Sequence, residues 1–292
     1  MRKLIICILI FMFFAVRFWF NAPSEKINVY DHKHNKVIKM DFERYIMNVL
    51  AAEMPASFEK EALKAQAVAA RTYTAQKIAS EWDDPYHKGA DICTDSTHCQ
   101  AYRELAELGE NAKKIHSAVD ETAGEVALWN GELIRAVFHS ASHGYTERSA
   151  DVWVEDLPYL QSMASPWDSA CPDYIYEVNF SADEVCALLN IDNPVIEQIT
   201  RSGAGGVMSI TIGRKEFKGT EVRSKLNLRS TCFTVTEKDG ILTFCTEGYG
   251  HGVGLSQWGA QGMAKEGYDY KEILRHYYSG ITIKKEKYSY LH

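Results

Sequence analysis

The residues best suited to acid–base chemistry lie in the segment 51–74. Glu53 stands at the end of a predicted helix, two residues before Pro55, which forces the chain to turn. Lys64 and Arg71 follow on a second predicted helix, and their seven-residue spacing puts both side chains on one face. A carboxyl group at this bend, facing two cations, can protonate a substrate held through its anionic groups. The alternative interpretation is an exposed glutamate beside a solvated basic face.

A polar loop further along carries residues of the types that bind zinc. His87, Cys93, His98 and Cys99 follow one another in the pattern H-x5-C-x4-H-C, which has zinc-ligand chemistry without the common finger spacing. A structural zinc on Cys93, His98 and Cys99 would fix this loop beside Glu53. A Cys93–Cys99 disulfide and free thiols are the alternatives. A zinc hydrolase that uses Cys93 and His98 is one functional hypothesis for this loop.

The segment 138–168 begins at the end of a predicted strand and enters a polar loop. Ser140, Ser142 and Thr146 supply hydroxyl groups there that can hydrogen-bond to a sugar. A serine nucleophile is disfavoured, because the segment has no nucleophile-elbow motif and no evident triad partner.

The segment 248–280 is rich in glycine around His251. Glycines at alternate positions permit positive φ and a close approach of the backbone. We expect His251 to bind substrate or to orient Glu53, and a structural loop is the alternative.

The elements that must position these residues alternate between helices and hairpins without regular βαβ crossovers. This pattern predicts an α+β fold of mixed helices and antiparallel strands, forming one catalytic unit behind a membrane anchor. Asn-Gly at 130–131 and Asp-Gly at 239–240 mark two hairpin turns. Helices are expected at residues 42–54, 59–82, 104–122, 181–189, 221–227, 256–265 and 270–278, and strands at 26–30, 36–40, 125–129, 133–139, 195–199, 207–212, 232–236 and 241–245.

The N-terminus predicts a single membrane-spanning anchor through residues 4–20. Residues 4–16 are an unbroken apolar run, and Arg2 and Lys3 before it predict an extracytoplasmic body. A cleaved signal peptide is the alternative, but no clear cleavage site follows. The expected organisation is an anchor at 1–20, a linker at 21–26, a catalytic domain at 27–284 and a tail at 285–292.

Charge and cysteine content restrict the partners and the compartment. The net charge of the chain is −7, from 32 basic and 39 acidic residues, which disfavours nucleic acid as a ligand. Of the seven cysteines, six lie beyond the anchor, where disulfides are permitted. Cys232 and Cys245 flank the second hairpin and can pair across it; buried thiols are the alternative.

Three long motifs in order give a specific resemblance. They are E-M-P followed by E-A-L-K-A-Q-A-V-A-A-R-T-Y in 53–73, the segment 138–168, and G-Y-G-H-G-V-G-L-S-Q-W-G-A-Q-G in the segment 248–280. The chain resembles the stage II sporulation protein D family of lytic transglycosylases over nearly all of residues 27–284. Ala141 stands where many relatives have a hydroxyl residue.

The resemblance implies that Glu53 is the single catalytic acid/base. It also implies that Lys64 and Arg71 support substrate binding and that Thr146 and Tyr159 belong to the site. The implied substrate is the glycan strand of peptidoglycan, stripped of stem peptides by a partner amidase, during engulfment of the forespore. Other engulfment membrane proteins are implied partners, and no cofactor is required for catalysis. Because some relatives are amidase enhancers, a non-catalytic glycan-binding module is the second hypothesis.

Overall fold

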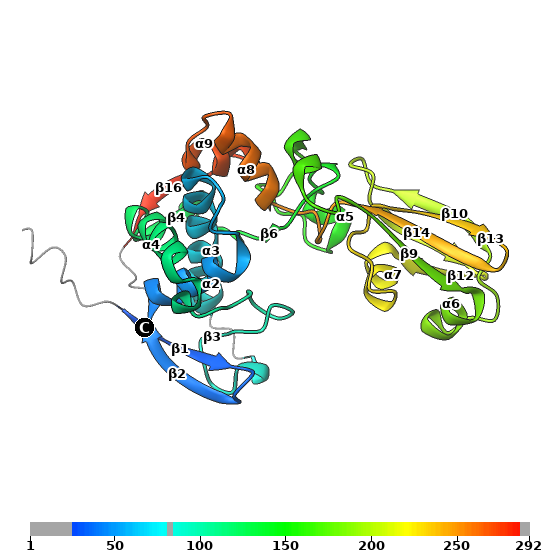
Figure 1. Cartoon of the computed structure of the whole chain (residues 1–292), viewed down its shortest axis with the longest axis horizontal. Helices are drawn as coiled ribbons and strands as arrows, with labels where there is room; N and C mark the ends of the chain where they lie inside the picture. Colours follow the sequence, from blue (N-terminus) through cyan, green and yellow to red (C-terminus); the bar gives the residue numbers. More distant parts are fainter. Residues whose placement is uncertain (1–24, 81–83, 287–292) are drawn as a thin grey trace, which may run out of the picture.

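The computed structural model describes residues 25–80 and 84–286, which form helices and mostly antiparallel strands around two large hydrophobic clusters (Figure 1). The larger cluster draws on residues between Ile27 and Leu160 and again between Val253 and Ile281. The smaller cluster draws on residues between Val185 and Phe244. We call the segment 175–247 the distal lobe and the remaining described residues the main lobe. The predicted α+β class is confirmed.

The main lobe is built around helix α3 (Lys60–Ala79), whose alanines let neighbouring elements approach closely. Four helices and one strand pack on α3: α2 (Phe42–Glu53), α4 (Ala112–Glu121), α8 (Gln257–Lys265), α9 (Tyr270–Tyr277) and β4 (Glu125–Trp129). Two small sheets complete the lobe, in the orders β2-β1-β3 and β16-β4-β5. Their other strands are β1 (Lys26–Asp31), β2 (Lys36–Asp41), β3 (Ile92–Cys93), β5 (Glu132–Leu133) and β16 (Thr282–Lys285).

The distal lobe consists of two three-stranded antiparallel sheets and two short helices around Phe217, Phe233 and Phe244. One sheet has the order β13-β14-β9, formed by β9 (Ile175–Ser181), β13 (Phe233–Lys238) and β14 (Ile241–Glu247). The other comprises β10 (Ile196–Arg201), β11 (Val207–Ile212) and β12 (Lys215–Lys218), and the helices are α6 (Ala182–Leu189) and α7 (Gly219–Lys225).

The part of the main lobe next to the distal lobe brings the second and third motifs side by side. Strand β15 (Leu255–Ser256) pairs parallel with β6 (Phe138–His139), and Ala141 bridges to Tyr249. Gly254 permits this contact: its φ is +73°, and a Cβ there would lie 2.3 Å from the Val137 carbonyl oxygen. Short elements fill the rest of the connection: β7 (Gly144–Tyr145), α5 (Ser149–Val152), β8 (Ala164–Ser165) and the 3-10 turn η3 (Pro166–Ala170).

Most of the expected elements are confirmed, with three differences. The helix expected at 104–122 begins as a 3-10 turn, η2 (Leu105–Asn111), before α4. The strand expected at 133–139 is divided between β5 and β6, because its two ends pair with different partners. The structure also has strands outside the expected ranges, namely β3, β7, β8, β9, β12, β15 and β16.

The predicted anchor at residues 4–20 lies outside the described residues. Within residues 25–80 and 84–286, no helix has both the length and the apolar character that crossing a membrane requires. The predicted domain boundaries stay a prediction.

Candidate active site and metal centre

A cavity of about 670 Å³ brings residues of all three motifs together. Glu53 enters it from the end of α2, and Tyr73 from α3. The second motif contributes His139 and Ser140, and the third contributes His251. Its other lining residues are Ser96, Thr97, His98, Cys99, Gln100, Ala101, Val137, Phe138, Trp153, Tyr249, Gly250 and Gln257.

Glu53 is held by two neutral hydrogen-bond donors. The Ala101 backbone N–H donates to Oε1 at 2.8 Å, and the Gln257 side-chain amide donates to Oε2 at 3.0 Å. Burial raises the pKa of the Glu53 carboxyl above its usual value, and the two hydrogen bonds partly oppose that rise. The arrangement therefore orients a carboxyl group that retains its proton to higher pH than an exposed glutamate.

The Gln257 donor is positioned through a buried carboxylate, Asp168. Ser256 caps α8 by accepting a hydrogen bond from the Gly259 N–H at 3.2 Å, and its hydroxyl also donates to Asp168. Ser142 donates to the other Asp168 oxygen at 2.5 Å. Asp168 thus joins the second motif to the N-terminus of the helix that carries Gln257.

Two histidines line the cavity as neutral rings. Burial, assisted by the positive charge of Arg223, lowers the pKa of His251 to about 4. The Val253 N–H donates to His251 Nδ1 at 3.1 Å, which assigns the ring proton to Nε2. Burial also holds the pKa of His139 well below its usual value, and its Nδ1 bonds to the Val253 carbonyl at 3.1 Å. Both rings supply polar atoms to the site without adding positive charge at neutral pH.

The structure brings only some of the predicted hydroxyl residues to the cavity. Ser140 lines it, whereas Ser142 is buried against Asp168. Thr146 is buried and bonds to the backbone of Gln161 and Met163, so its side chain fixes a loop. The Tyr159 hydroxyl accepts a hydrogen bond from the Arg135 N–H at 3.1 Å, away from the cavity lining.

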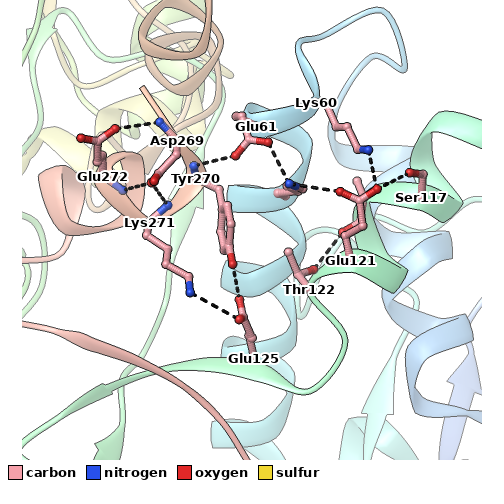
Figure 2. Close-up of polar contacts among 12 residues, drawn as sticks. Lys60, Glu61, Ser117, Glu121, Thr122, Glu125, Asp269, Tyr270, Lys271 and Glu272 are labelled. Carbon is pink, nitrogen blue, oxygen red and sulfur yellow. Dashed lines mark hydrogen bonds and ion pairs between the residues drawn. The ribbon is translucent and has the colours of Figure 1, made fainter. Parts of the chain in front are cut away.

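Lys64 and Arg71 do not face Glu53 as predicted. Tyr73 faces the cavity, and Lys64 lies nine residues earlier, about two and a half helical turns away and so on the opposite side of α3. Lys64 pairs there with Glu61 at 2.8 Å and Glu121 at 3.1 Å. Figure 2 shows this polar network, which links α3 to α4, β4 and α9.

Arg71 shares that side of α3 and is fully buried. Its guanidinium donates to both carboxylate oxygens of Glu43, at 2.9 and 2.7 Å, and to the Glu125 carbonyl at 3.2 Å. The bidentate pair ties α3 to α2, and the bond to the Glu125 carbonyl ties α3 to β4. The spacing argument placed both cations correctly on one face, but the fold turns that face toward α4 and α9.

The predicted zinc ligands, together with His87, converge at one point. The ligand atoms of His87, Cys93, His98 and Cys99 all lie within 4.8 Å of one another. His87 Nε2 lies 3.2 Å from both Cys99 Sγ and His98 Nδ1, and His98 Nδ1 lies 3.4 Å from Cys99 Sγ and 3.5 Å from Cys93 Sγ. Zinc bonds of roughly 2.0–2.3 Å in a tetrahedron place ligand atoms at about such separations.

The surroundings of this cluster also fit zinc. The second ring nitrogen of His98 lies 2.8 Å from the Asp84 carboxylate, a pairing that orients metal-bound histidines. The six cysteines of the described residues form no disulfide with one another. The hairpin between Cys232 and Cys245 is present, but Cys245 stands opposite Thr234. The loop that holds the cluster continues directly into Ala101, the donor to Glu53.

Sequence reasoning missed Gln257 and the Ala101 N–H as partners of Glu53. Gln257 had a local signal, because it follows the helix-capping Ser256 inside the third motif. The Ala101 donor had none, since every non-proline residue has a backbone N–H and only the course of the loop selects this one.

Comparison with known proteins finds similar sequences among sporulation proteins. The family model described as "Stage II sporulation protein" matches residues 30–129. The chain is 36% identical over 269 residues to stage II sporulation protein D of Bacillus amyloliquefaciens, covering 88% of this chain and 78% of the relative. It is 37% identical over 274 residues to stage II sporulation protein D of Bacillus subtilis (strain 168), covering 90% and 80%.

A more distant relative carries a different name. The amidase enhancer of Bacillus subtilis (strain 168) is 28% identical over 296 residues, covering 82% of this chain and 40% of that protein. The predicted resemblance is confirmed by the extent of these matches. The chain belongs to the stage II sporulation protein D family.

Proposed function

We propose that the protein is a lytic transglycosylase that cleaves peptide-stripped glycan strands of peptidoglycan, with Glu53 as its single acid/base. The supporting observation is one carboxyl group, held by two neutral donors, in a cavity where burial raises its pKa. Among the described residues that line this cavity, Glu53 is the only carboxylate. Hydrolytic glycosidases generally need two, whereas an intramolecular transfer needs one.

In this mechanism Glu53 acts twice. The protonated carboxyl donates its proton to the glycosidic oxygen as the bond from that oxygen to the muramic acid C1 breaks. The resulting carboxylate then accepts the proton of the C6 hydroxyl while O6 forms a bond to C1, giving a 1,6-anhydro end. No water is consumed, and Glu53 returns to its starting state. Gln257 and Ala101 stabilise the carboxylate between the two steps.

The cluster of two histidines and two cysteines is proposed to hold a structural zinc. Four protein ligands close a tetrahedral site and leave no position for a reactive water, which disfavours the zinc-hydrolase hypothesis. The metal would fix the loop that delivers the Ala101 N–H to Glu53. Catalysis itself is proposed to need no cofactor.

The proposed setting is the outer face of a membrane during sporulation. The apolar run at residues 4–16 supports a single-pass anchor with the described lobes extracytoplasmic. A partner amidase would supply stripped strands, because the proposed substrate lacks stem peptides. Other engulfment membrane proteins and the cell membrane complete the proposed environment.

Product analysis tests the reaction. We expect the purified full chain to release anhydro-muramic ends from stripped strands, detected by mass spectrometry. Glu53→Gln should lower the rate at least about 100-fold, and Glu132→Gln, at an exposed position, should leave it unchanged. Reducing ends without anhydro sugar would refute transglycosylation, and normal turnover by Glu53→Gln would refute the assigned acid/base.

The second candidate function is a glycan-binding module that activates an amidase. The 28% identity to an amidase enhancer favours it. The same assay without any amidase separates the two: stripped strands that bind but stay intact would support the module.

A further inference from the structure

The reaction proposed above leaves open which cation binds the carboxylates of the strand, since Lys64 and Arg71 lie away from the cavity. We propose that Arg229, supported by Arg223, binds a lactyl carboxylate of the glycan strand. The muramic acid unit that carries this carboxylate would lie next to the sugar that enters the Glu53 cavity. This inference rests on the proposed substrate, and it assigns carboxylate recognition to the distal lobe.

Arg229 lies beside the cavity, because its guanidinium stands over the ring of Tyr249, a lining residue. Tyr249 lines the cavity and is 49% exposed. The Arg229 guanidinium carbon lies 5.4 Å from the centre of the Tyr249 ring and 3.9 Å from the centre of the Tyr176 ring. The Gly250 N–H donates to the Arg229 carbonyl at 2.9 Å, which fixes the arginine backbone to the cavity wall. The two ring contacts therefore hold a planar cation at the rim of the site.

The Arg229 side chain is partly open to solvent, with an exposed fraction of 24%. Its contacts with charged or polar groups are to Asp173: the carbonyl at 3.2 Å and the carboxylate at 3.4 Å. The Asp173 side chain is 67% exposed, so this ion pair is weak and exchanges readily with an incoming carboxylate. No other carboxylate of the described residues lies within ion-pair distance of Arg229.

Arg223 adds positive charge behind Arg229. Its Nε lies 3.3 Å from the carbonyls of Leu228 and Arg229, so it braces the turn that presents Arg229. No carboxylate in the described part of the chain forms an ion pair with Arg223. Its charge contributes to the lowered pKa of His251, which shows that its field reaches the cavity.

This group of residues matches the chemistry of a muramic acid unit. A guanidinium binds a carboxylate through two parallel hydrogen bonds, and exposed tyrosine rings pack on the C–H faces of sugars. The chain as a whole has a net charge of −7, so a polyanionic strand needs a local cationic contact. Arg229 and Arg223 provide that contact beside the cavity.

A binding experiment tests this assignment without requiring turnover. Calorimetry uses the full chain with Glu53→Gln and two probes: stripped strands that carry lactyl carboxylates, and N-acetylglucosamine oligomers of the same length that lack them. Adding Arg229→Gln should weaken strand binding about tenfold and change oligomer binding by less than about twofold. Arg229→Lys should lose less, because it keeps the charge but not the planar pair of donors.

Arg214→Gln is the matched control, since Arg214 is an exposed arginine of the same lobe on the turn between β11 and β12. It should leave both affinities unchanged. Unchanged strand binding by Arg229→Gln would overturn the proposal, and so would an equal loss with both probes. If the wild type yields no anhydro ends while the probe discrimination is present, the proposed reaction fails and the carboxylate site stands.

Discussion

At the scale of single residues, the charge state of Glu53 follows from where α2 ends. The carboxyl group is desolvated by the cavity walls and receives hydrogen bonds only from neutral donors, so nothing nearby fully compensates its ionised form. The nearby histidines are neutral for the same reason. An acid catalyst at neutral pH requires this combination of burial and neutral partners.

The raised pKa of Glu53 predicts a stability cost at neutral pH. The folded state holds this proton more strongly than the unfolded chain, so its contribution to the free energy of unfolding is fully present below the usual glutamate pKa and is lost as the pH rises through the folded-state pKa. Glu53→Gln should therefore be more stable than the wild type at pH 7, with the difference vanishing near pH 4. Urea unfolding at both pH values measures this.

Glu132→Gln, at an exposed position, should show no such pH-dependent difference. If Glu53→Gln and the wild type had the same free energy of unfolding at pH 7, the argument that burial raises the pKa of Glu53 would be contradicted. In the wild type, kcat/KM should fall as the pH rises through the same pKa.

At the scale of elements, the loop before Ala101 is the part that we expect a bound metal to order. It carries His87, Cys93, His98 and Cys99 and has little regular structure besides the turn η1 (Pro85–His87) and the two-residue β3. Its end supplies one of the two hydrogen bonds to Glu53. A metal bound there would add a further restraint on the position of the Ala101 donor.

Removal of zinc is therefore expected to reduce activity by at least about tenfold, in line with the loss of one positioned donor. Hydrogen exchange at the Ala101 amide should accelerate, and added zinc should restore both properties. Cys99→Ser should behave like the chelated protein, whereas Cys245→Ser, on a distal strand, should not. Full activity and unchanged exchange after chelation would show that the cluster needs no metal.

At the scale of the whole molecule, the two hydrophobic clusters predict that the two lobes can unfold separately. The distal lobe has its own core, and Phe244 lies in it with its ring centre 5.8 Å from Phe233 and 5.9 Å from Phe180. The proposed acid/base Glu53 and its hydrogen-bond partner Gln257 belong to the main lobe, while Arg229 belongs to the distal lobe. Binding of a long strand would therefore engage both lobes.

Phe244→Ala should destabilise the distal lobe by about 3–5 kcal/mol, because it removes a fully buried ring. Hydrogen exchange should accelerate across residues 175–247 while α2 and α3 stay protected. Phe42→Ala is the matched change in the main lobe and should expose α2 and α3 instead. Uniform loss of protection in Phe244→Ala would show that residues 27–284 unfold as one unit.

The sequence alone determined most of the local structure and identified the residues whose side chains are suited to acid–base chemistry or metal binding. Glu53 at a proline bend, the zinc-type pattern ending at Cys99, and the α+β pattern of helices and hairpins were all readable, because helix ends, turns and ligand types are local properties. Three motifs in order were also enough to establish the resemblance that the comparisons confirm.

Only the tertiary structure decided which faces meet. Helical spacing placed Lys64 and Arg71 together, but the packing of α2 and α4 turned that face toward Glu43 and Glu121 and left Tyr73 at the cavity. Arg229 reached the cavity rim through a loop from the distal lobe. Such contacts join residues far apart in the chain, and no local pattern specifies them, because they depend on how the elements pack.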